Sequence, residues 1–428
     1  MSTANKTDDA DASRRQFLRK SFAGAGWIVA GGVLSHCSDS DGTGGTGGSA
    51  GAGGEGGTAG MGGAGGAPAM SNIASLGPLQ DPDENGVRLP EGFTSRVVAV
   101  AGEEVASTGY VWHGSPDGGA IYQTSDGGWI YVSNSELLGP IGGGVSAVRF
   151  SSSGDVTDAY RILGDTNQNC AGGPTPWDTW LSCEEREDGR VWECDPFGVA
   201  DPIVREALGV FYHEAVAVDP QTQYLYLTED RGNGRFYRFV PDNLVNGMAD
   251  LSAGTLQVAQ VSGGGPEGSV TWLDVPDPSA QSGMTRTQVP ESTAFDGGEG
   301  IWYHDGVVYF TTKGDNRVWA FETGSSTLTV LYDAATSGNP ILTGVDNVTV
   351  SPTGDVLVAE DGGNMEIVAL TPDGTIAPIV QVVGQDSSEI TGPVFDPSFE
   401  RLYFSSQRGP SGNFTDGITY EVSGPFAG

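Results

Sequence analysis

Short apolar segments alternate with polar turns along most of the chain. From Leu89 onward, alternating or wholly apolar runs recur between clusters of Gly, Pro, Asp and Asn. Such runs, bounded by turn residues, are typical of β-strands. The sequence sustains no 3.6-residue helical period over a useful length in this part. We therefore expect an all-β fold.

An internal repeat organises these predicted strands. Its unit is an acidic residue, a strand, a tight turn and a second strand that ends in polar residues. Three clear copies span 214–230, 299–313 and 346–361, and weaker copies begin at Asp117, Asn169 and Gly392. The starts of the last three copies, Glu299, Asp346 and Gly392, are 47 and 46 residues apart. This spacing is typical of a four-stranded propeller blade.

The six copies predict a six-bladed β-propeller in a single domain, residues 71–428. The longer spacing between Glu214 and Glu299 predicts one blade plus an insertion at about 251–292, which is rich in Gly, Ser and Pro. A spare strand at 93–100 is placed to pair with 418–422 and to close the ring.

The first 70 residues carry signals for export. Arg14 and Arg15 form a twin-arginine motif before a short, weakly apolar stretch, and residues 1–37 are predicted to be the signal peptide. Its end resembles a lipobox, in which Cys37 would be acylated, although His36 replaces the usual small residue. Residues 38–70 form a Gly-rich linker. We expect a monomer in the periplasm or cell envelope, and leave the lipid anchor open.

The charge balance excludes one class of partner. The chain has 20 Lys and Arg against 55 Asp and Glu, a net charge of −35. Nucleic acid binding requires a basic surface, so we exclude it. Beyond residue 68 the only lysine is Lys313.

Propeller geometry predicts where this acidity gathers. The start of a blade's first strand and the end of its second meet at one face. The first strands contribute Glu214, Glu299 and Asp346. The second strands contribute Asn134, Glu136, Cys183, Glu184, Glu185, Glu229, Asp230, Glu360 and Asp361, with Lys313 and Arg408 in the equivalent places of two further blades. Carboxylates this dense favour bound metal ions, and the two cations favour an anion such as a phosphate ester. Solvated turn residues are the alternative.

The run from Asn169 to Glu185, NCAGGPTPWDTWLSCEE, resembles the signature of the PhoX-type alkaline phosphatase family. Supporting stretches are Asn85–Pro90, His213–Pro220, Gly298–Gly300 and Thr391–Pro393. The resemblance implies a twin-arginine-exported propeller that hydrolyses phosphomonoesters at alkaline pH. It implies ferric iron (Fe³⁺) and calcium as cofactors, with a metal-bridged oxide or hydroxide as the nucleophile.

The resemblance also assigns residues. It implies Cys183 as the iron-ligating cysteine and Glu214 as an acidic ligand. The predicted metal ligands are Glu136, Cys183, Glu184, Glu214, Glu229, Asp230, Glu299, Asp346, Glu360 and Asp361. The predicted catalytic residues are Cys183, Glu214, Lys313 and Arg408.

The chain looks like the short branch of the family and departs from its pattern at Tyr212 and at Asp178, which replaces a glycine common in the signature. Longer members place an arginine, thought to bind phosphate, at the position of Tyr212. Lys313, Arg231 or Arg408 could supply that charge here. A disulfide between Cys170 and Cys194 is left open.

Two other functions remain open from the residues. One is a propeller hydrolase of another substrate class, such as a lactonase, against which Cys183 argues because calcium or zinc sites do not need a thiolate. The other is a non-catalytic propeller that is stabilised by metal and binds a surface.

Overall fold

The computed structural model describes residues 71–139 and 142–427. Within these ranges the regular structure consists of β-strands and a few short 3₁₀ helices. No helix in the described part is long and apolar enough to cross a membrane. The predicted signal peptide at 1–37 and the linker at 38–70 lie outside the described residues. The prediction of an all-β fold is confirmed.

Five large sheets contain nearly all of the strands. The first consists of β3 (Pro116–Gln123), β4 (Trp129–Ser135), β5 (Gly144–Phe150) and β6 (Val156–Gly164); the second of β7 (Asn169–Pro174), β8 (Trp180–Glu184), β9 (Val191–Cys194) and β10 (Ile203–Val204). The third has nine strands: β11 (His213–Val218), β12 (Leu225–Glu229), β13 (Tyr237–Pro241), β16 (Gly254–Val261), β17 (Gly268–Asp274), β21 (Thr327–Asp333), β20 (Arg317–Glu322), β19 (Val307–Thr312) and β18 (Gly298–His304).

The remaining two large sheets bring together the two ends of the described chain. One orders β22 (Val345–Val350), β23 (Val356–Glu360), β24 (Glu366–Leu370), β25 (Ile376–Val382) and β1 (Val87–Arg88). The other orders β26 (Ile390–Phe395), β27 (Arg401–Ser406), β28 (Ile418–Ser423) and β2 (Thr94–Val100). A separate hairpin pairs β14 (Leu244–Val245) with β15 (Met248–Ala249).

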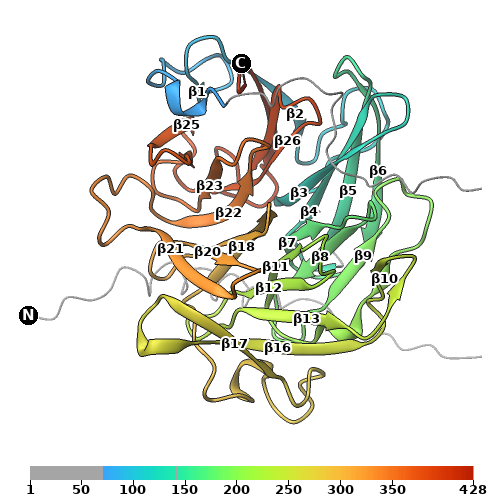
Figure 1. Cartoon of the computed structure of the whole chain (residues 1–428). Helices are drawn as coiled ribbons and strands as arrows, with labels where there is room; N and C mark the ends of the chain where they lie inside the picture. The colour runs from blue at the N-terminus through green and yellow to red at the C-terminus, as the bar shows by residue number, and fades with distance from the viewer. Residues whose placement is uncertain (1–70, 140–141, 428) are drawn as a thin grey trace, which may run out of the picture. The chain divides into compact units, whose positions relative to one another are not determined.

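The sheets are arranged as in a propeller. Strands β3, β7, β11, β18, β22 and β26 contact one another in a closed cycle at the centre, and the colours of Figure 1 follow the sheets around that centre in chain order. The nine-stranded sheet places both of its edges, β11 and β18, in this cycle. Its continuity comes from the pairing of β17 with β21. Hydrogen bonding thus gives five large sheets, where the sequence predicted six blades.

The ring closes through the two ends of the described chain. Strand β2 pairs antiparallel with β28, from Thr94 opposite Ser423 to Val100 opposite Ile418. Strands β2 and β26 form the two edges of this sheet, with β28 and β27 between them. The predicted closure by 93–100 is confirmed. Because residues far apart in the sequence make this contact, neither end can leave without opening the sheet.

The insertion was only partly predicted. Strand β16 lies inside the predicted segment 251–292 but pairs with β13 from Gly254 to Val258, so it is an outer strand of the sheet. Strand β17 extends the same sheet further. The irregular part of the segment therefore lies mainly after β17. Apolar alternation in β16 buries Leu256 and Val258, a pattern that the Gly and Ser content of the segment obscured.

Five of the central strands share one irregularity at their starts. In β3, β7, β11, β18 and β22 the first residue pairs with the partner strand, and the register then shifts across the next two residues. Such a β-bulge redirects side chains out of the regular ladder. The second residues of these strands are Asp117, Cys170, Glu214, Glu299 and Asp346.

Directly after these residues the central strands approach closely. An ideal Cβ on Gly118 would lie 2.5 Å from Ala171 Cα, and one on Gly300 would lie 2.5 Å from Val348 N. A cavity of about 30 Å³ is lined here by Gly118, Ala171, Gly300 and other residues. The centre is therefore nearly filled at this level, because that volume holds about one water molecule.

Candidate metal centre

The second residues of the central strands form a continuous cluster of possible ligands. Four groups each bring three ligand atoms within 4.8 Å of one another: Asp117, Glu136 and Cys170; Cys170, Glu185 and Glu214; Glu214, Glu299 and Asp346; and Asp346, Asp361 and Glu389. Neighbouring groups share Cys170, Glu214 or Asp346. The side chains therefore make one connected site, with oxygen ligands throughout and a single sulfur.

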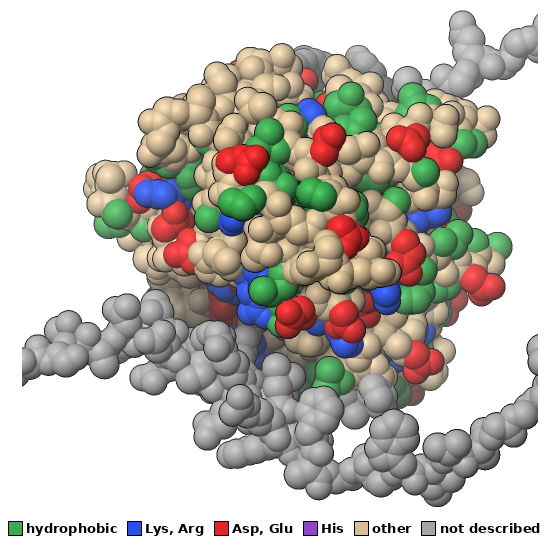
Figure 2. Space-filling view, turned by 90° about the horizontal axis from the view of Figure 1, so that it is seen from below, with side chains coloured by type: hydrophobic (Ala, Val, Ile, Leu, Met, Phe, Trp, Pro, Cys, Tyr) green, Lys and Arg blue, Asp and Glu red, His purple; other side chains and the backbone are tan. Residues whose placement is uncertain are grey.

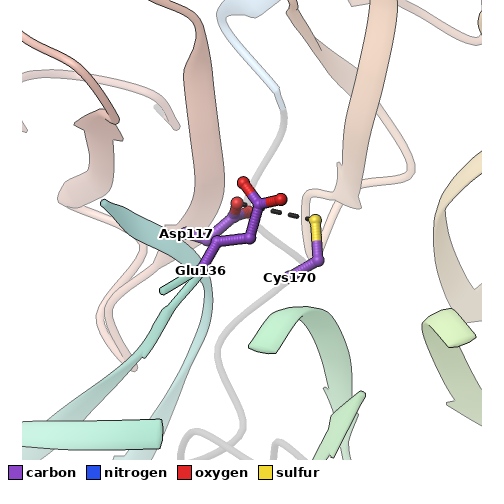
Figure 3. A group of neighbouring side chains, drawn as sticks. All are labelled: Asp117, Glu136 and Cys170. Carbon is purple, nitrogen blue, oxygen red and sulfur yellow. Dashed lines mark hydrogen bonds between the residues drawn. The ribbon is translucent and has the colours of Figure 1, made fainter. Parts of the chain in front are cut away.

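The first group is held together by protein hydrogen bonds. Figure 3 shows Asp117, Glu136 and Cys170 converging, with Cys170 Sγ donating to Asp117 Oδ2 at 3.5 Å. Gln407 Nε2 donates to Asp117 Oδ2 at 2.6 Å and to Glu136 Oε2 at 2.9 Å. Burial raises the pKa of Asp117 well above its usual value, and the charge of Glu136 raises it further. Burial and the charge of Asp117 likewise raise the pKa of the Cys170 thiol.

Glu214 bears the largest electrostatic cost in the cluster, because no hydrogen-bond donor among the described residues compensates its charge. Its side chain is fully buried, and neither carboxylate oxygen has a hydrogen-bond partner among the described residues. Burial raises its pKa well above the usual value, and the charges of Glu185 and Asp346 add to the effect. Burying an ionised carboxylate without a partner costs roughly several kcal/mol of folding free energy. A bound cation would remove that cost.

Lys313 neutralises part of the site. Its Nζ lies 2.8 Å from Asp230 Oδ2 and also forms an ion pair with Glu299. Burial still raises the pKa of Glu299, with the Lys313 charge acting in the opposite direction. Asp346 accepts a hydrogen bond from Asn347 Nδ2 at 2.8 Å. Lys313 therefore lies where the sequence predicted a cation, but it is bound to carboxylates.

Arg408 has the same role at the other end of the cluster. Its Nη2 lies 2.6 Å from Glu389 Oε2 and 3.5 Å from Asp361 Oδ1. Its Nη1 donates to Gln407 Oε1 at 2.9 Å. The sequence predicted Arg408 as the residue of this blade that corresponds to Lys313. In the structure that residue is Gln407, because Gln407 directly follows β27 and Lys313 directly follows β19.

Three predicted ligands, Glu184, Glu229 and Glu360, are occupied elsewhere. Glu184 accepts hydrogen bonds from the backbone amides of residues 167 and 190. Glu360 accepts them from the amides of residues 343 and 366. Glu229 binds the Tyr237 hydroxyl and the Arg286 guanidinium. All three belong to none of the ligand groups.

The physical reason is their register. Each of these glutamates is the last residue of the second strand, where it pairs with the first residue of the central strand. Successive side chains point in opposite directions along a strand. The following residues are therefore the ones that face the centre: Glu185, Asp230 and Asp361. Glu184, Glu229 and Glu360, which the sequence predicted as ligands, lie outside the candidate groups of the described residues.

Among the described residues, the cysteine in the ligand groups is Cys170, whereas Cys183, the predicted ligand, lies outside them. Cys183 is fully buried in an apolar cluster with Leu181, Val191 and Val216. Burial raises the pKa of its thiol. Cys170, at the bulge of β7, belongs to two ligand groups. Cys170 and Cys194 are both free, so no disulfide joins them.

Asn134 was predicted at the site and instead positions it. Its Nδ2 donates to the carbonyls of Cys170, at 3.1 Å, and Ala171, at 2.7 Å. Its Oδ1 accepts from Trp180 Nε1 at 2.9 Å and from Ser182 Oγ at 3.0 Å. Because Asn134 lies in β4, these bonds tie the bulge of β7 that presents Cys170 to the preceding sheet.

With this geometry in place, comparison with known proteins becomes informative. The profile of the alkaline phosphatase PhoX family matches residues 122–195, 186–324 and 317–409, which is more than half of the chain. The chain belongs to the PhoX family of alkaline phosphatases. The resemblance in the sequence is confirmed. No curated protein sequence matches the chain.

Solved structures support the fold. Pseudomonas fluorescens PhoX in complex with vanadate, a transition state analogue, aligns with a TM-score of 0.67 and 18% identity over 82% of this chain and 97% of that one. A gluconolactonase from Xanthomonas campestris aligns with a TM-score of 0.43 and 15% identity over 82% and 98%. A calcium-binding protein, regucalcin, from Agrobacterium tumefaciens aligns with a TM-score of 0.43 and 14% identity over 77% and 96%. The alignment with Pseudomonas fluorescens PhoX supports the fold, and the two alignments with a TM-score of 0.43 give no further support.

Sequence reasoning missed three members of the site in this PhoX-family chain: Asp117, Cys170 and Glu389. A signal existed for the first two. Asp117 and Cys170 stand in the weaker repeats where Glu214 stands in a clear one, as the second residue of the central strand. Glu389 precedes β26 and has no equivalent in the repeat, so only the structure could place it.

The interior cluster differs from the acidic surface around it. Figure 2 shows one face of the molecule, where Asp and Glu side chains lie dispersed among polar and apolar ones. In the centre, Glu214, Glu299, Asp346 and Glu389 are all buried. Part of the net negative charge is therefore concentrated where water does not screen it.

Proposed function

We propose that this chain hydrolyses small phosphomonoesters with bound metal ions in the central cluster. The environment of the Glu214 carboxylate is the observation that supports the proposal most strongly. In a chain of the PhoX alkaline phosphatase family, Glu214 is a fully buried carboxylate whose two oxygens have no hydrogen-bond partner in the described part of the chain. It belongs to two ligand groups, so it would help to hold a cation in either of them.

The ligand chemistry of the two groups differs, which supports two kinds of metal. Cys170, Glu185 and Glu214 combine one sulfur with carboxylate oxygens, and we propose that they hold ferric iron. Glu214, Glu299 and Asp346 offer only carboxylate oxygens, which suits calcium. The sulfur ligand proposed here is Cys170. When bound, such ions neutralise charge on phosphoryl oxygens and lower the pKa of a coordinated water.

The chain's own residues would hold these ions in place. Asn134 fixes the bulge that carries Cys170. Asn347 orients Asp346 and also accepts a hydrogen bond from the amide of Gly392 at 2.6 Å. Lys313 and Arg408 reduce the repulsion among carboxylates that are not neutralised by metal. These contacts preorganise the site, and preorganisation lowers the cost of binding.

We further propose that the nine-stranded sheet counts as two blades. Both of its edges lie in the central cycle, and β17 with β21 joins two otherwise complete four-stranded units at their outer edge. The propeller would then have six blades, in one domain at 71–428. Export by a twin-arginine signal at 1–37, anchoring at Cys37 and a monomeric state remain proposals from the sequence.

The direct test is the hydrolysis of p-nitrophenyl phosphate by the purified chain after loading with iron and calcium. We expect activity between about pH 7 and about pH 10, together with inhibition by vanadate. Glu214→Gln should abolish activity, whereas Glu187→Gln, at an exposed turn, should retain it. A loaded wild-type protein that hydrolyses no phosphomonoester in this range would refute the function.

A further inference from the structure

The cations near the metal centre are not equivalent. Lys313 pairs with Asp230 and Glu299. Arg408 pairs with Glu389 and Asp361 and also binds Gln407. A phosphate ester reaching either cation would have to compete with carboxylates that are already in contact with it.

Arg231 is held differently. Its guanidinium carbon lies 3.2 Å from the centroid of the Tyr212 ring. It forms no ion pair with any carboxylate among residues 71–139 and 142–427. The side chain is partly exposed. A guanidinium that lies over an aromatic face holds its N–H donors in its own plane, where another group can accept hydrogen bonds from them.

The Arg231 and Tyr212 pair borders the group that contains Glu214. Tyr212 forms an isolated backbone bridge with Glu185 and stands two residues before Glu214. Arg231 directly follows Asp230, whose charge acts on Glu214. Tyr212 therefore lies just before β11, and Arg231 lies just after β12. These are the strand ends that carry Glu214 and Asp230.

We propose that Arg231, held on Tyr212, binds the phosphoryl oxygens of the substrate at this edge of the site. The proposal rests on the proposed function, because it assigns the substrate-binding cation of that same reaction. The planar guanidinium fork can donate two parallel hydrogen bonds to a phosphate. Arg231 would contact substrate, and Tyr212 is a positioning residue that acts through it.

The test uses the full-length, metal-loaded protein and measures inorganic phosphate binding by calorimetry, along with kcat and KM for p-nitrophenyl phosphate. Loss of a charge-assisted hydrogen bond predicts that Arg231→Gln weakens phosphate binding and raises KM by about 10- to 100-fold. Arg231→Lys should recover part of this loss. Metal content and melting temperature should not change.

Tyr212 and a remote arginine provide the matched variants. Tyr212→Phe keeps an aromatic face and should bind phosphate like the wild type. Tyr212→Ala removes the face and should raise the phosphate Kd and KM in the same direction as Arg231→Gln, by a smaller factor. Arg149 pairs with Asp126 at 2.7 Å on an outer surface, so Arg149→Gln should leave both constants unchanged.

The outcomes separate this inference from the proposed function. If the wild type hydrolyses the ester and Arg231→Gln has an unchanged phosphate Kd and KM, the inference is overturned and the function stands. If the wild type hydrolyses no ester but binds phosphate in a way that Arg231→Gln weakens, the anion site stands and the function fails. Equal loss in Arg231→Gln and Arg149→Gln would also overturn the inference.

Discussion

At the scale of single residues, Glu214 dominates the energetics of the metal centre. Its carboxylate is buried, lies near Glu185 and Asp346, and has no hydrogen-bond donor among the described residues. The folded protein without metal must therefore protonate this group or bear an uncompensated charge. The Glu214 carboxylate therefore favours cation binding at the expense of the stability of the metal-free fold.

Removing this charge should stabilise the metal-free protein. Glu214→Gln replaces the carboxylate with a neutral group of similar shape, and we expect an increase of about 1–3 kcal/mol in the free energy of unfolding after chelation. Glu184→Gln is the control, because Glu184 accepts two backbone amides and should lose stability instead. Chemical denaturation at about pH 8 measures both. A destabilised Glu214→Gln would contradict this reading.

The raised carboxyl pKa values also predict how metal removal changes the pH dependence. Burial raises the pKa of Asp117, Glu214 and Glu299 in the folded protein, so the fold binds more protons than the unfolded chain above the unfolded pKa, roughly 4. The stability of chelated protein should be greatest at acidic pH and fall as pH rises through the raised pKa values.

Thermal unfolding of chelated protein from about pH 5 to about pH 8 tests this trend. The melting temperature should fall with rising pH, and addition of calcium and iron at about pH 8 should restore it. A chelated protein that becomes more stable over this range would show that the cluster is not protonated in the metal-free fold.

Single residues also explain what the sequence left undecided. The repeat predicted that Glu214, Glu299 and Asp346 share one face, and the structure brings their side chains together in one group. It could not separate Glu184 from Glu185, because a one-residue step decides which side chain faces the centre. The same limit applies to Cys170 and Cys183, since a bulge, invisible in the apolar pattern, turns Cys170 toward the centre.

At the scale of elements, the bulges and the small residues beside them set the geometry of the site. The strand alternation and the 46- to 47-residue spacing were enough to predict sheets around a centre. Pairing at the outer edge was not predictable, because the exposed edge of β17 meets β21 through only Gly268 and Ser269. A short edge contact leaves little trace in the sequence.

Gly300 tests the close approach of the central strands. A Cβ at this position would lie 2.5 Å from Val348 N and 2.6 Å from Asn347 Cα, which are backbone atoms. Gly300→Ala should therefore lower the free energy of unfolding by about 1–3 kcal/mol through overpacking. It should also reduce metal content, because it displaces the strand that carries Asp346.

The matched control is Gly324→Ala, where a Cβ would meet nothing within 4 Å. It should leave stability and metal content near those of the wild type. Denaturant unfolding and elemental analysis of the two variants check the prediction. Equal behaviour of the two would mean that the central strands have room to separate.

At the scale of the whole molecule, the fold depends on the closure of the ring of sheets. The last sheet contains β2, which comes from near the start of the described chain. The apolar side of β2 is buried, with Val98 8% exposed. Val97, beside it, is 40% exposed. Closure joins the first and last sheets, so a defect in β2 should affect the entire ring.

Paired substitutions in β2 test this closure. Val98→Asp buries a charge in the apolar cluster and should cost several kcal/mol, roughly enough to unfold a marginally stable domain. Val97→Asp places the same charge in solvent and should cost less than about 1 kcal/mol. Circular dichroism melting distinguishes them. A Val98→Asp protein as stable as Val97→Asp would show that the ring does not depend on β2.

The central claim, a metal centre built on Cys170 and Glu214 rather than on Cys183, is tested most directly by elemental analysis. The purified wild type, Cys170→Ser and Cys183→Ser would be compared in one experiment. We predict iron in the wild type and in folded Cys183→Ser, and its loss from folded Cys170→Ser. A wild type without iron, or iron retained by Cys170→Ser and lost from Cys183→Ser, would contradict the account.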